Sequence, residues 1–275
     1  MHRSQQALDA GVEHMKLLES DGQAIKVLSR DQVIALEPAL AHARDQIAGA
    51  ILCPTDETGD CAKFTRALAA RIVERRGSIV TGATVRALTT DGDTVTQALT
   101  DRGTFSGDVY VLALGAESPI LARSLGFRLP IYPIKGYSLT IPIGASKSPP
   151  SIACLDEHNL VAISRFGDRL RVTATAEFAG YDASHKPSDF AFMKRVTQEL
   201  FPDGAEYDRA EMWAGLRPMT PTNLPLIGRR RLKNLILNCG HGHIGWTMSH
   251  GSARIAADLI AGRAPAIPMD GLMAA

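Results

Sequence analysis

The chain has 275 residues, 45% hydrophobic and 21% charged, which is typical of a globular protein of one large or two modest domains. Thirty basic and 29 acidic residues leave a net charge of +1, so no nucleic-acid or anionic-membrane partner is predicted. No apolar run is long enough to span a membrane, and the first residues lack the apolar core of a secretion signal. Four cysteines without a Cys-x-x-Cys pair predict reduced, unreactive thiols in a cytoplasmic protein.

The first quarter of the chain predicts three helices and one strand. Helices are expected over residues 4–21 and 29–37, the second with a capping box at Ser29 and a stop at Pro38. A short apolar run over 47–53 predicts a strand. A helix from Asp60 to Arg76 should follow and end at Gly77. One face of that helix is apolar and carries Phe64, Leu68, Ile72 and Val73.

From residue 78 the hydrophobic period changes to two, which predicts short strands over 78–80, 83–88, 94–99 and 104–105. The continuous apolar run 109–114 predicts a strand buried on both faces. Further β regions are expected over 134–143 and 160–176, a helix over 187–201, a last strand over 235–238, and a closing helix over 247–261. Helix-separated strands together with antiparallel stretches predict an α/β fold of mixed α+β character, with two interleaved domains.

A literal G-x-G-x-x-G lies between the last strand and the closing helix, at Gly240, Gly242 and Gly245. A dinucleotide fingerprint needs a βαβ unit and an acidic residue about 20 positions later. Here the chain ends 30 residues after Gly245 without a second strand. Because a helix N-terminus suits negative charge, this turn could hold a phosphate or the edge of a reduced flavin, or it could simply join a strand to a helix.

Two stretches at this end of the chain carry a family resemblance. They read WAGLRPMTPTNLPLIG over 213–228 and NLILNCGHGHIGWTM over 234–248. They resemble the C-terminal signature of the D-amino-acid oxidase superfamily of flavoproteins, and within it the bacterial D-amino-acid dehydrogenase small subunits. Supporting stretches begin at Pro54, Tyr132 and Ile163, so the resemblance covers nearly the whole chain.

The resemblance implies the C-terminal part of a two-domain FAD-dependent oxidoreductase. An incomplete Rossmann-like FAD domain, residues 58–127 and 217–275, would be interleaved with an antiparallel-sheet substrate domain, residues 1–57 and 128–216. Family members begin with a βαβ segment that carries the true glycine fingerprint, and this chain starts after it. The strands near Val80 and Val111 should therefore lack a shared neighbour. We expect the chain alone to fold poorly or bind FAD weakly, and a complementing N-terminal segment to be a partner.

Particular residues follow from the same resemblance. Arg217 would grip the substrate carboxylate with two parallel hydrogen bonds, although a structural arginine is the alternative. Tyr137 would contact substrate beside the flavin or be a strand aromatic with a satisfied hydroxyl, and both readings stay open. Thr173, Ala174 and Thr175 stand where relatives tend to have glycines and could crowd the flavin. The FAD-binding residues implied are Val85, Gly115, Lys135, Gly136, Gly240, His241, Gly242, His243, Ile244, Gly245, Trp246 and Thr247.

Other chemistry-bearing residues have simpler explanations. Three histidines suggest a metal, but no carboxylate or cysteine set completes a ligand group, so no metal site is predicted: His241, His243 and His250. Three acids are better explained as loop and capping residues than as a catalytic pair: Asp56, Glu57 and Asp60. Arg165 is better explained as a solvated strand end than as a second cation of the pocket.

The predicted activity is FAD-dependent oxidation of a D-amino acid, such as D-alanine, to a 2-oxo acid and ammonia. Electrons would pass to a quinone-type or respiratory-chain acceptor, which implies either a cytoplasmic protein or one attached peripherally to the inner face of the plasma membrane. Two alternatives remain open. The chain could be a truncated, catalytically incompetent fragment or partner subunit, or it could resemble a glycine or sarcosine oxidase.

Overall fold

The computed structural model describes residues 1–272, which group into two compact units. The first unit comprises Met1–Asp60, Gly136–Glu177 and Ala183–Gly215, and the second comprises Cys61–Lys135, Phe178–Asp182 and Leu216–Ala275. Each unit is therefore assembled from three separate stretches of chain.

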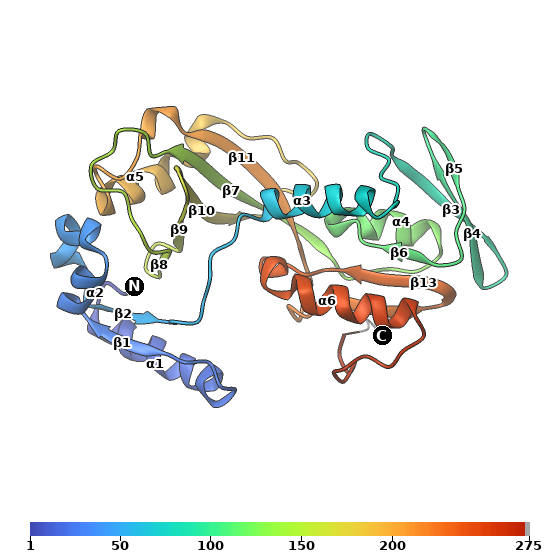
Figure 1. The fold of residues 1–275 in the computed structure, drawn as a ribbon, viewed down its shortest axis with the longest axis horizontal. Helices are drawn as coiled ribbons and strands as arrows, with labels where there is room; N and C mark the ends of the chain where they lie inside the picture. The colour runs from blue at the N-terminus through green and yellow to red at the C-terminus, as the bar shows by residue number, and fades with distance from the viewer. Residues whose placement is uncertain (273–275) are drawn as a thin grey trace. The chain divides into compact units, whose positions relative to one another are not determined.

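The first unit is built on a five-stranded sheet of order β11-β7-β10-β9-β8 (Figure 1). Its strands are β7 (Tyr132–Pro142), β8 (Cys154–Asp156), β9 (Val161–Phe166), β10 (Arg169–Glu177) and β11 (Glu211–Met219). A separate antiparallel pair contains β1 (Lys26–Ser29) and β2 (Gly49–Leu52). The helices are α1 (Gln5–Ser20), α2 (Arg30–Leu36) and α5 (Ala191–Leu200), with short 3-10 helices η1 (Pro38–Gln46), η3 (Pro187–Phe190) and η4 (Tyr207–Arg209).

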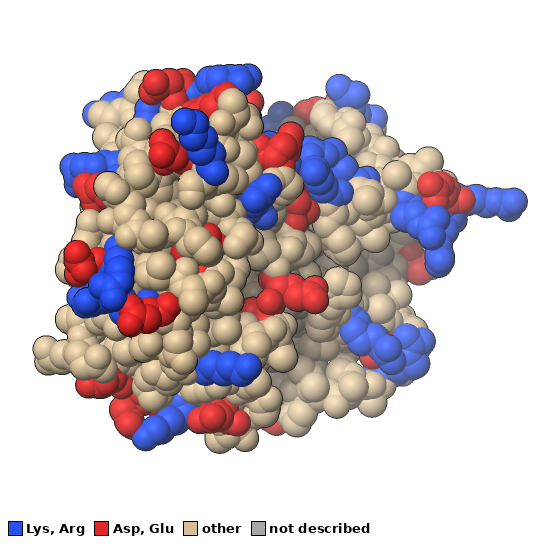
Figure 2. Space-filling model, turned by 60° about the vertical axis from the view of Figure 1, so that its left-hand side comes forward, with Lys and Arg blue, Asp and Glu red and all other residues tan. Residues whose placement is uncertain are grey.

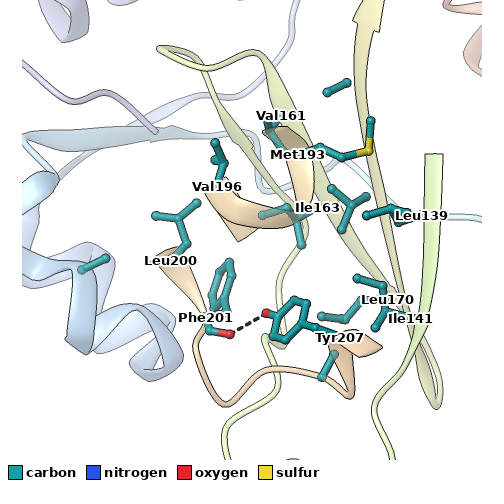
Figure 3. Packing of buried hydrophobic residues seen from close by; sticks show 14 of the residues in the cluster. Leu139, Ile141, Val161, Ile163, Leu170, Met193, Val196, Leu200, Phe201 and Tyr207 are labelled. Atoms are coloured by element: carbon teal, nitrogen blue, oxygen red, sulfur yellow. Dashed lines mark hydrogen bonds between the residues drawn. The ribbon is translucent and has the colours of Figure 1, made fainter. Parts of the chain in front are cut away.

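The core of the first unit lies between this sheet and α5 (Figure 3). Alternate residues of β7 and β9, among them Leu139 and Ile163, pack with Met193 and Leu200 of the helix. Each such fully buried side chain contributes about 1.5–3 kcal/mol. A polar group at the edge of this core is also satisfied, because the Tyr207 hydroxyl donates to the Phe201 carbonyl at 2.5 Å (Figure 3). Burial raises the pKa of that phenol, which stays protonated.

Local sequence signals decide the helix starts in the first unit. Ser29 accepts from the Gln32 amide at 3.4 Å, and the Gln32 side chain accepts from the Ser29 amide at 2.8 Å. The predicted capping box is thus confirmed. Ser4 caps α1 in a similar way, by accepting from the Ala7 amide at 3.2 Å.

The second unit contains two three-stranded sheets (Figure 1). One has the order β12-β13-β6, in which β12 (Leu226–Arg230) is antiparallel and β6 (Tyr110–Leu112) parallel to β13 (Leu232–Cys239). The other is an antiparallel meander of β3 (Val85–Asp91), β4 (Thr94–Thr100) and β5 (Gly103–Phe105). Helices α3 (Cys61–Glu74), α4 (Ser118–Ser124) and α6 (Gly245–Ile260) and the short η2 (Gly115–Glu117) complete the unit.

One asparagine ties the two sheets of the second unit together. The Asn234 side chain accepts from the Val95 amide at 2.8 Å and donates to the Val95 carbonyl at 2.8 Å. The side chain thereby substitutes for a missing backbone partner between β13 and β4. Both sheets then share one apolar core that includes Leu112, Leu235 and Leu237.

Several predicted elements differ from the structure. The strand predicted over 78–80 is wrong, because this stretch is irregular and exposed. The run 109–114 forms only the short β6, and Val111 is 43% exposed, so it is not a strand buried on both faces. Among the described residues the stretch 78–80 has no neighbouring strand, and β6 has one, β13, on one side only. At the end of α3 the left-handed position is taken by Arg76, with φ 65°, and not by Gly77.

Basic and acidic side chains are interspersed on the molecular face shown in Figure 2. No helix within residues 1–272 is both long and apolar enough to cross a membrane.

Candidate functional site

The candidate site lies in the second unit, at the carboxyl ends of its two parallel strands. Leu112 of β6 stands opposite Leu237 of β13. Three residues beyond each, Gly115 and Gly240 take left-handed conformations, with φ 56° and 75°. Ligands of open α/β sheets bind just outside the carboxyl ends of parallel strands, so this edge is where a ligand is expected.

The turn after β13 needs glycine for two reasons. Gly240 and Gly242 both have positive φ, 75° and 58°. A Cβ at Gly240 would lie 2.9 Å from Thr220 Cγ2, and one at Gly242 would lie 3.0 Å from Met219 Sδ. Gly245 starts α6, and there a Cβ would lie 3.1 Å from that of His241. We call residues 240–245 the glycine turn; its backbone is closely covered on one side by Met219 and Thr220.

The first turn of α6 presents backbone donors. Its N-cap residue, Ile244, supplies no side-chain cap bond, so the helix N–H groups are not satisfied by a capping side chain. His241 is held against the same helix, because its Nε2 lies 2.9 Å from Ser252 Oγ. Burial lowers the pKa of His241, which keeps the ring neutral at neutral pH. The positive end of the α6 dipole is therefore the main electrostatic feature of this turn.

Arg217 belongs to the strand that packs on the glycine turn. It is half-buried near the end of β11, and the carbonyl of the next residue, Pro218, accepts from the Gly242 amide at 3.0 Å. Burial lowers the pKa of the Arg217 guanidinium, which remains charged at neutral pH. A cation and a positive helix end thus come from neighbouring segments of the second unit.

Tyr137 lies in the first unit, where it is buried in β7. Its hydroxyl donates to the Glu177 carboxylate, and its ring packs edge-on against Phe190 with centroids 5.3 Å apart. This geometry matches a strand aromatic with a satisfied hydroxyl; the substrate-contact role stays a prediction. Lys135, also buried, and Gly136 precede it in the same strand.

The remaining cofactor candidates lie in the second unit. Val85 begins β3 and packs against the apolar core of the second unit. Four residues around the start of α6 are exposed: His243, Ile244, Trp246 and Thr247. The Trp246 ring meets that of Phe64 edge-on at 5.4 Å between centroids.

Other candidates take structural roles. Asp60 accepts a hydrogen bond from Arg169 Nη2 at 2.9 Å, and the exposed Arg165 donates to the Gly167 carbonyl in its own hairpin at 2.9 Å. Among residues 1–272 no group of three or more histidine, cysteine or acidic side chains could hold a metal ion. Burial raises the pKa of Cys154 to about 12 and that of Cys239 to about 11, so both thiols stay protonated.

Sequence reasoning missed the residues that shape this site without reacting. Met219 and Thr220 cover the glycine turn, Ser252 holds His241, and Glu177 accepts from Tyr137. Met219 follows Arg217 by two residues in β11, but this alternation gave no signal because the strand itself was not predicted from the sequence. The pairing of Tyr137 with Glu177 spans 40 residues and has no counterpart in local sequence.

The model of one protein family, FAD dependent oxidoreductase (DAO), matches residues 1–259. The chain belongs to the DAO family. This confirms the predicted family and the predicted FAD cofactor class. The chain is 46% identical over 272 residues to D-amino acid dehydrogenase 2 of Mesorhizobium japonicum, an alignment that covers 98% of this chain and 65% of the relative. It is 49% identical to D-amino acid dehydrogenase of Paramagnetospirillum magneticum over 86% of this chain and 56% of that protein.

Solved structures of DAO-type enzymes share the fold. Glycine oxidase from Geobacillus kaustophilus superposes with a TM-score of 0.88 at 22% identity, covering 99% of this chain and 72% of that one. L-proline dehydrogenase from P. horikoshii gives 0.84 at 16% identity, over 99% of this chain and 74% of the other. The predicted mixed α/β class is confirmed. The chain thus spans 56–65% of the length of these dehydrogenases and about three quarters of the solved structures.

The residues present fit part of an FAD molecule. The uncapped start of α6 would offer backbone N–H groups to a flat, electron-rich ring edge. Glycine is required at 240 and 242 for a different reason, because Thr220 and Met219 already fill the space that a Cβ would take. At Gly115 a Cβ would meet no atom within 4 Å, so the backbone is open to a ligand on that side. The residues that would hold the DAO cofactor are therefore concentrated at the ends of β6 and β13.

Proposed function

We propose that this chain forms the flavin-facing part of an FAD-dependent enzyme that oxidises D-amino acids to 2-oxo acids and ammonia. The observation that carries the proposal is the bond from the Gly242 amide to the Pro218 carbonyl, at 3.0 Å. That bond ties the segment bearing Arg217 to the glycine turn. The relatives named D-amino acid dehydrogenase, at 46–49% identity, support this choice of substrate class.

Arg217 fixes the substrate in this proposal. Its planar guanidinium matches a carboxylate with two parallel hydrogen bonds, and half-burial strengthens that pairing relative to open water. A free amino acid offers a carboxylate at one end and the reacting Cα at the next atom. Holding the carboxylate therefore limits where Cα–H can point.

FAD, when bound, supplies the hydride acceptor for the Cα–H of the substrate. The glycine turn allows the backbone to approach the cofactor, and the positive end of α6 stabilises negative charge that develops there. His241 stays neutral and anchored to Ser252, so it acts on the shape of the turn and not as a cation. The imino acid product hydrolyses in water to the 2-oxo acid and ammonia, and no side-chain base is required.

Three finer elements belong to this proposal. The acceptor of the electrons is a quinone-type or respiratory-chain molecule, and the protein works in the cytoplasm or at the inner face of the plasma membrane. The substrate-domain part comprises residues 1–57 and 128–216, and the FAD-domain part comprises residues 58–127 and 217–275. The implied cofactor contacts at Val85, Gly115, Lys135, Gly136 and the glycine turn remain proposed contacts.

A chimera tests the proposal directly. This chain would replace the matching 272-residue region of the Mesorhizobium japonicum relative, which shares 46% of its residues there. Under anaerobic conditions D-alanine should bleach the visible absorbance of bound FAD, whereas L-alanine and glycine should not. A cooperative melt and stoichiometric flavin establish that the chimera is folded before substrate is added.

Three results would reject the proposal. A folded chimera without flavin would reject the cofactor site, and a flavin-loaded one that no D-amino acid reduces would reject the activity. Reduction by glycine but not by D-alanine would favour a glycine-oxidase-like enzyme instead.

A further inference from the structure

Two basic stretches of the second unit contain no acidic residue. They are residues 123–128, at the end of α4, and residues 229–233, at the hairpin between β12 and β13. Their basic side chains are Arg123, Arg128, Arg229, Arg230, Arg231 and Lys233. The whole chain has a net charge of only +1, so this concentration of positive charge is local. Like charges that gather on one surface repel, and an anionic ligand relieves this repulsion.

Contacts within the second unit bring the two stretches together. The Arg231 guanidinium donates from Nη1 to the Gly126 carbonyl at 2.8 Å. A Cβ at Gly126 would lie 3.1 Å from the same nitrogen, so the guanidinium lies directly against this glycine. The Arg230 guanidinium lies over the Phe127 ring, 5.7 Å from its centroid. The hairpin is therefore held against the residues that follow α4.

A cavity of about 610 Å³ lies at this junction. Its lining residues are Arg123, Gly126, Phe127 and Arg128, so two of the four carry a guanidinium group. A third guanidinium, that of Arg231, is fixed beside the cavity by its bond to Gly126. We call these five residues the arginine cavity.

The cations of the hairpin differ in how they are compensated. Lys233 pairs with Asp93 at 2.7 Å, and Arg229 donates to the carbonyls of Lys233 and Leu259. Within residues 1–272, by contrast, no carboxylate forms an ion pair with the three guanidinium groups of the arginine cavity. All three side chains, Arg123, Arg128 and Arg231, are exposed. Their positive charge is therefore available to a ligand from solution.

The backbone at the end of α4 does not oppose an anion. The Arg123 carbonyl accepts from the Gly126 amide at 3.0 Å, and the Ala122 carbonyl accepts from the Phe127 amide at 3.2 Å. The Gly126 carbonyl accepts from Arg231. These bonds occupy the carbonyl groups nearest the cavity, and the guanidinium groups remain the polar groups that face it.

We propose that the arginine cavity binds a phosphoryl group that carries two negative charges or more. A guanidinium presents a planar fork of N–H donors that matches two oxygen atoms of a phosphoryl group. Three guanidinium groups supply more positive charge than one carboxylate can neutralise. A phosphate monoester or a pyrophosphate provides both the charge and enough oxygen atoms for all three.

The arginine cavity is separate from the glycine turn. Arg231 immediately precedes β13, and Gly240 immediately follows it. Nine residues of extended strand span roughly 30 Å, at about 3.3 Å per residue. The two sites thus lie at opposite ends of one strand, and the phosphoryl ligand is additional to the cofactor. This inference does not rest on the proposed function.

Calorimetric titration with sodium pyrophosphate tests the inference, on both the 275-residue chain and the flavin-loaded chimera. We expect one binding site with a dissociation constant of about 1 mM or tighter. The double variant Arg123→Gln with Arg128→Gln should weaken this binding at least about tenfold, because two charge-assisted hydrogen-bonding groups are lost.

A matched double variant controls for the loss of charge. Arg66→Gln with Arg75→Gln removes two exposed cations in and just after α3, and should leave the pyrophosphate affinity within about twofold. All four substituted side chains are exposed, so neither double variant should unfold the protein. Equal melting temperatures of the two variants without ligand check this.

Vesicles distinguish a free phosphoryl ligand from a lipid headgroup. Phosphatidylcholine vesicles with and without phosphatidic acid are sedimented with the protein. Retention by phosphatidic acid that pyrophosphate reverses identifies a headgroup as the source, whereas binding of pyrophosphate alone identifies a free anion. The inference is overturned if pyrophosphate does not bind at about 10 mM, or if the Arg123–Arg128 variant binds it as tightly as the Arg66–Arg75 variant.

Discussion

Thr175, near the end of β10, has a left-handed backbone with φ 69°. For a β-branched residue this conformation costs about 1–2 kcal/mol. Thr175→Gly should therefore raise the free energy of unfolding by about 0.5–1 kcal/mol, since glycine adopts this φ freely but loses more entropy on folding. Thr173→Gly, two residues earlier in β10 and paired with Ala162 of β9, should lower it by about 1 kcal/mol.

Urea denaturation of the two variants measures the difference. If both glycines destabilise equally, the left-handed geometry of Thr175 is not the source of strain. The family resemblance pointed to residues 173–175 as a group, but it could not show which of them takes the left-handed backbone. The φ angle at one position of a strand depends on how that strand pairs with its neighbours, and it cannot be read from the sequence.

The buried pair Arg3–Asp156 is a second residue-scale feature. Asp156 is fully buried and Arg3 nearly so, and their closest atoms are 2.7 Å apart. Replacing Arg3 with Met removes the cationic partner of the buried Asp156 carboxylate, which keeps only its hydrogen bonds from Asn159 and His158, and should cost about 3 kcal/mol of unfolding free energy. Arg44→Met breaks an exposed pair with Asp31 and should cost less than about 1 kcal/mol. Equal losses measured by chemical denaturation would contradict this contrast.

Asp156 also gives the protein a pH dependence. Burial alone would raise its pKa, but hydrogen bonds from Arg3 and Asn159 outweigh burial and hold the pKa below the ordinary value of 3.8. A depressed folded-state pKa contributes stability above the unfolded pKa, and this stability is lost as pH falls through the folded value. The stability difference between the native chain and Asp156→Asn should thus be largest at neutral pH and shrink below pH 3.8. A difference that does not change with pH would exclude this ionisation.

At the scale of elements, the strand–glycine turn–helix is the testable unit. Gly242→Ala should place a Cβ 3.0 Å from Met219 Sδ on a residue with φ 58°. It should lower the free energy of unfolding by about 1–2 kcal/mol and also weaken the binding of FAD. Gly251→Ala lies inside α6, where a Cβ meets nothing within 4 Å. It should stabilise the helix by about 0.5–1 kcal/mol. Thermal melts and flavin titration of the chimera distinguish the two, and a Gly242→Ala variant with unchanged flavin affinity would contradict the role of the turn.

The elements that could be predicted are those decided locally. The Ser29–Gln32 capping box, the turn between β3 and β4 at Gly92, and the stop of α6 at Gly262 all follow from residues within a few positions of one another. Strands β11 and β12 were not predicted, because Pro218, Pro221 and Pro225 hide the strand pattern and only pairing with distant strands makes it regular. The strand predicted over 78–80 is the opposite case, a prediction without a strand. Its sequence is apolar, but no neighbouring strand supplies the backbone hydrogen bonds that would make it part of a sheet.

For the candidate site too, only the features decided by local sequence could be predicted. The glycine spacing, read with its position near the end of the chain, pointed to the turn, and the Leu-Arg-Pro motif pointed to Arg217. The strand register that brings the turns of Gly115 and Gly240 to the same sheet edge arises from tertiary structure, in which Leu112 pairs with Leu237. Neither strand alone indicates which other strand lies next to it.

At the scale of the whole molecule, two units with separate apolar cores predict unequal protection from solvent. Amides of Leu235–Leu237, buried at the centre of the β12-β13-β6 sheet, should exchange most slowly in the second unit. Amides of β6 and of residues 78–80 should exchange much faster, because among the described residues β6 has a strand on one side only and residues 78–80 pair with none. Hydrogen exchange followed by mass spectrometry checks this order. Equal protection of β6 and Leu235–Leu237 in the chain alone would contradict an open sheet edge.

The central claim is that Arg217, held beside the glycine turn, binds the carboxylate of a D-amino acid that reduces FAD. The measurement is an anaerobic D-alanine titration of flavin absorbance in the chimera, with Arg217→Lys and, as control, the exposed hairpin variant Arg165→Lys. Loss of bidentate pairing should raise the half-bleaching concentration of D-alanine by about 10–100-fold in Arg217→Lys, and leave it unchanged in Arg165→Lys. Equal half-bleaching concentrations in the two variants would contradict the account.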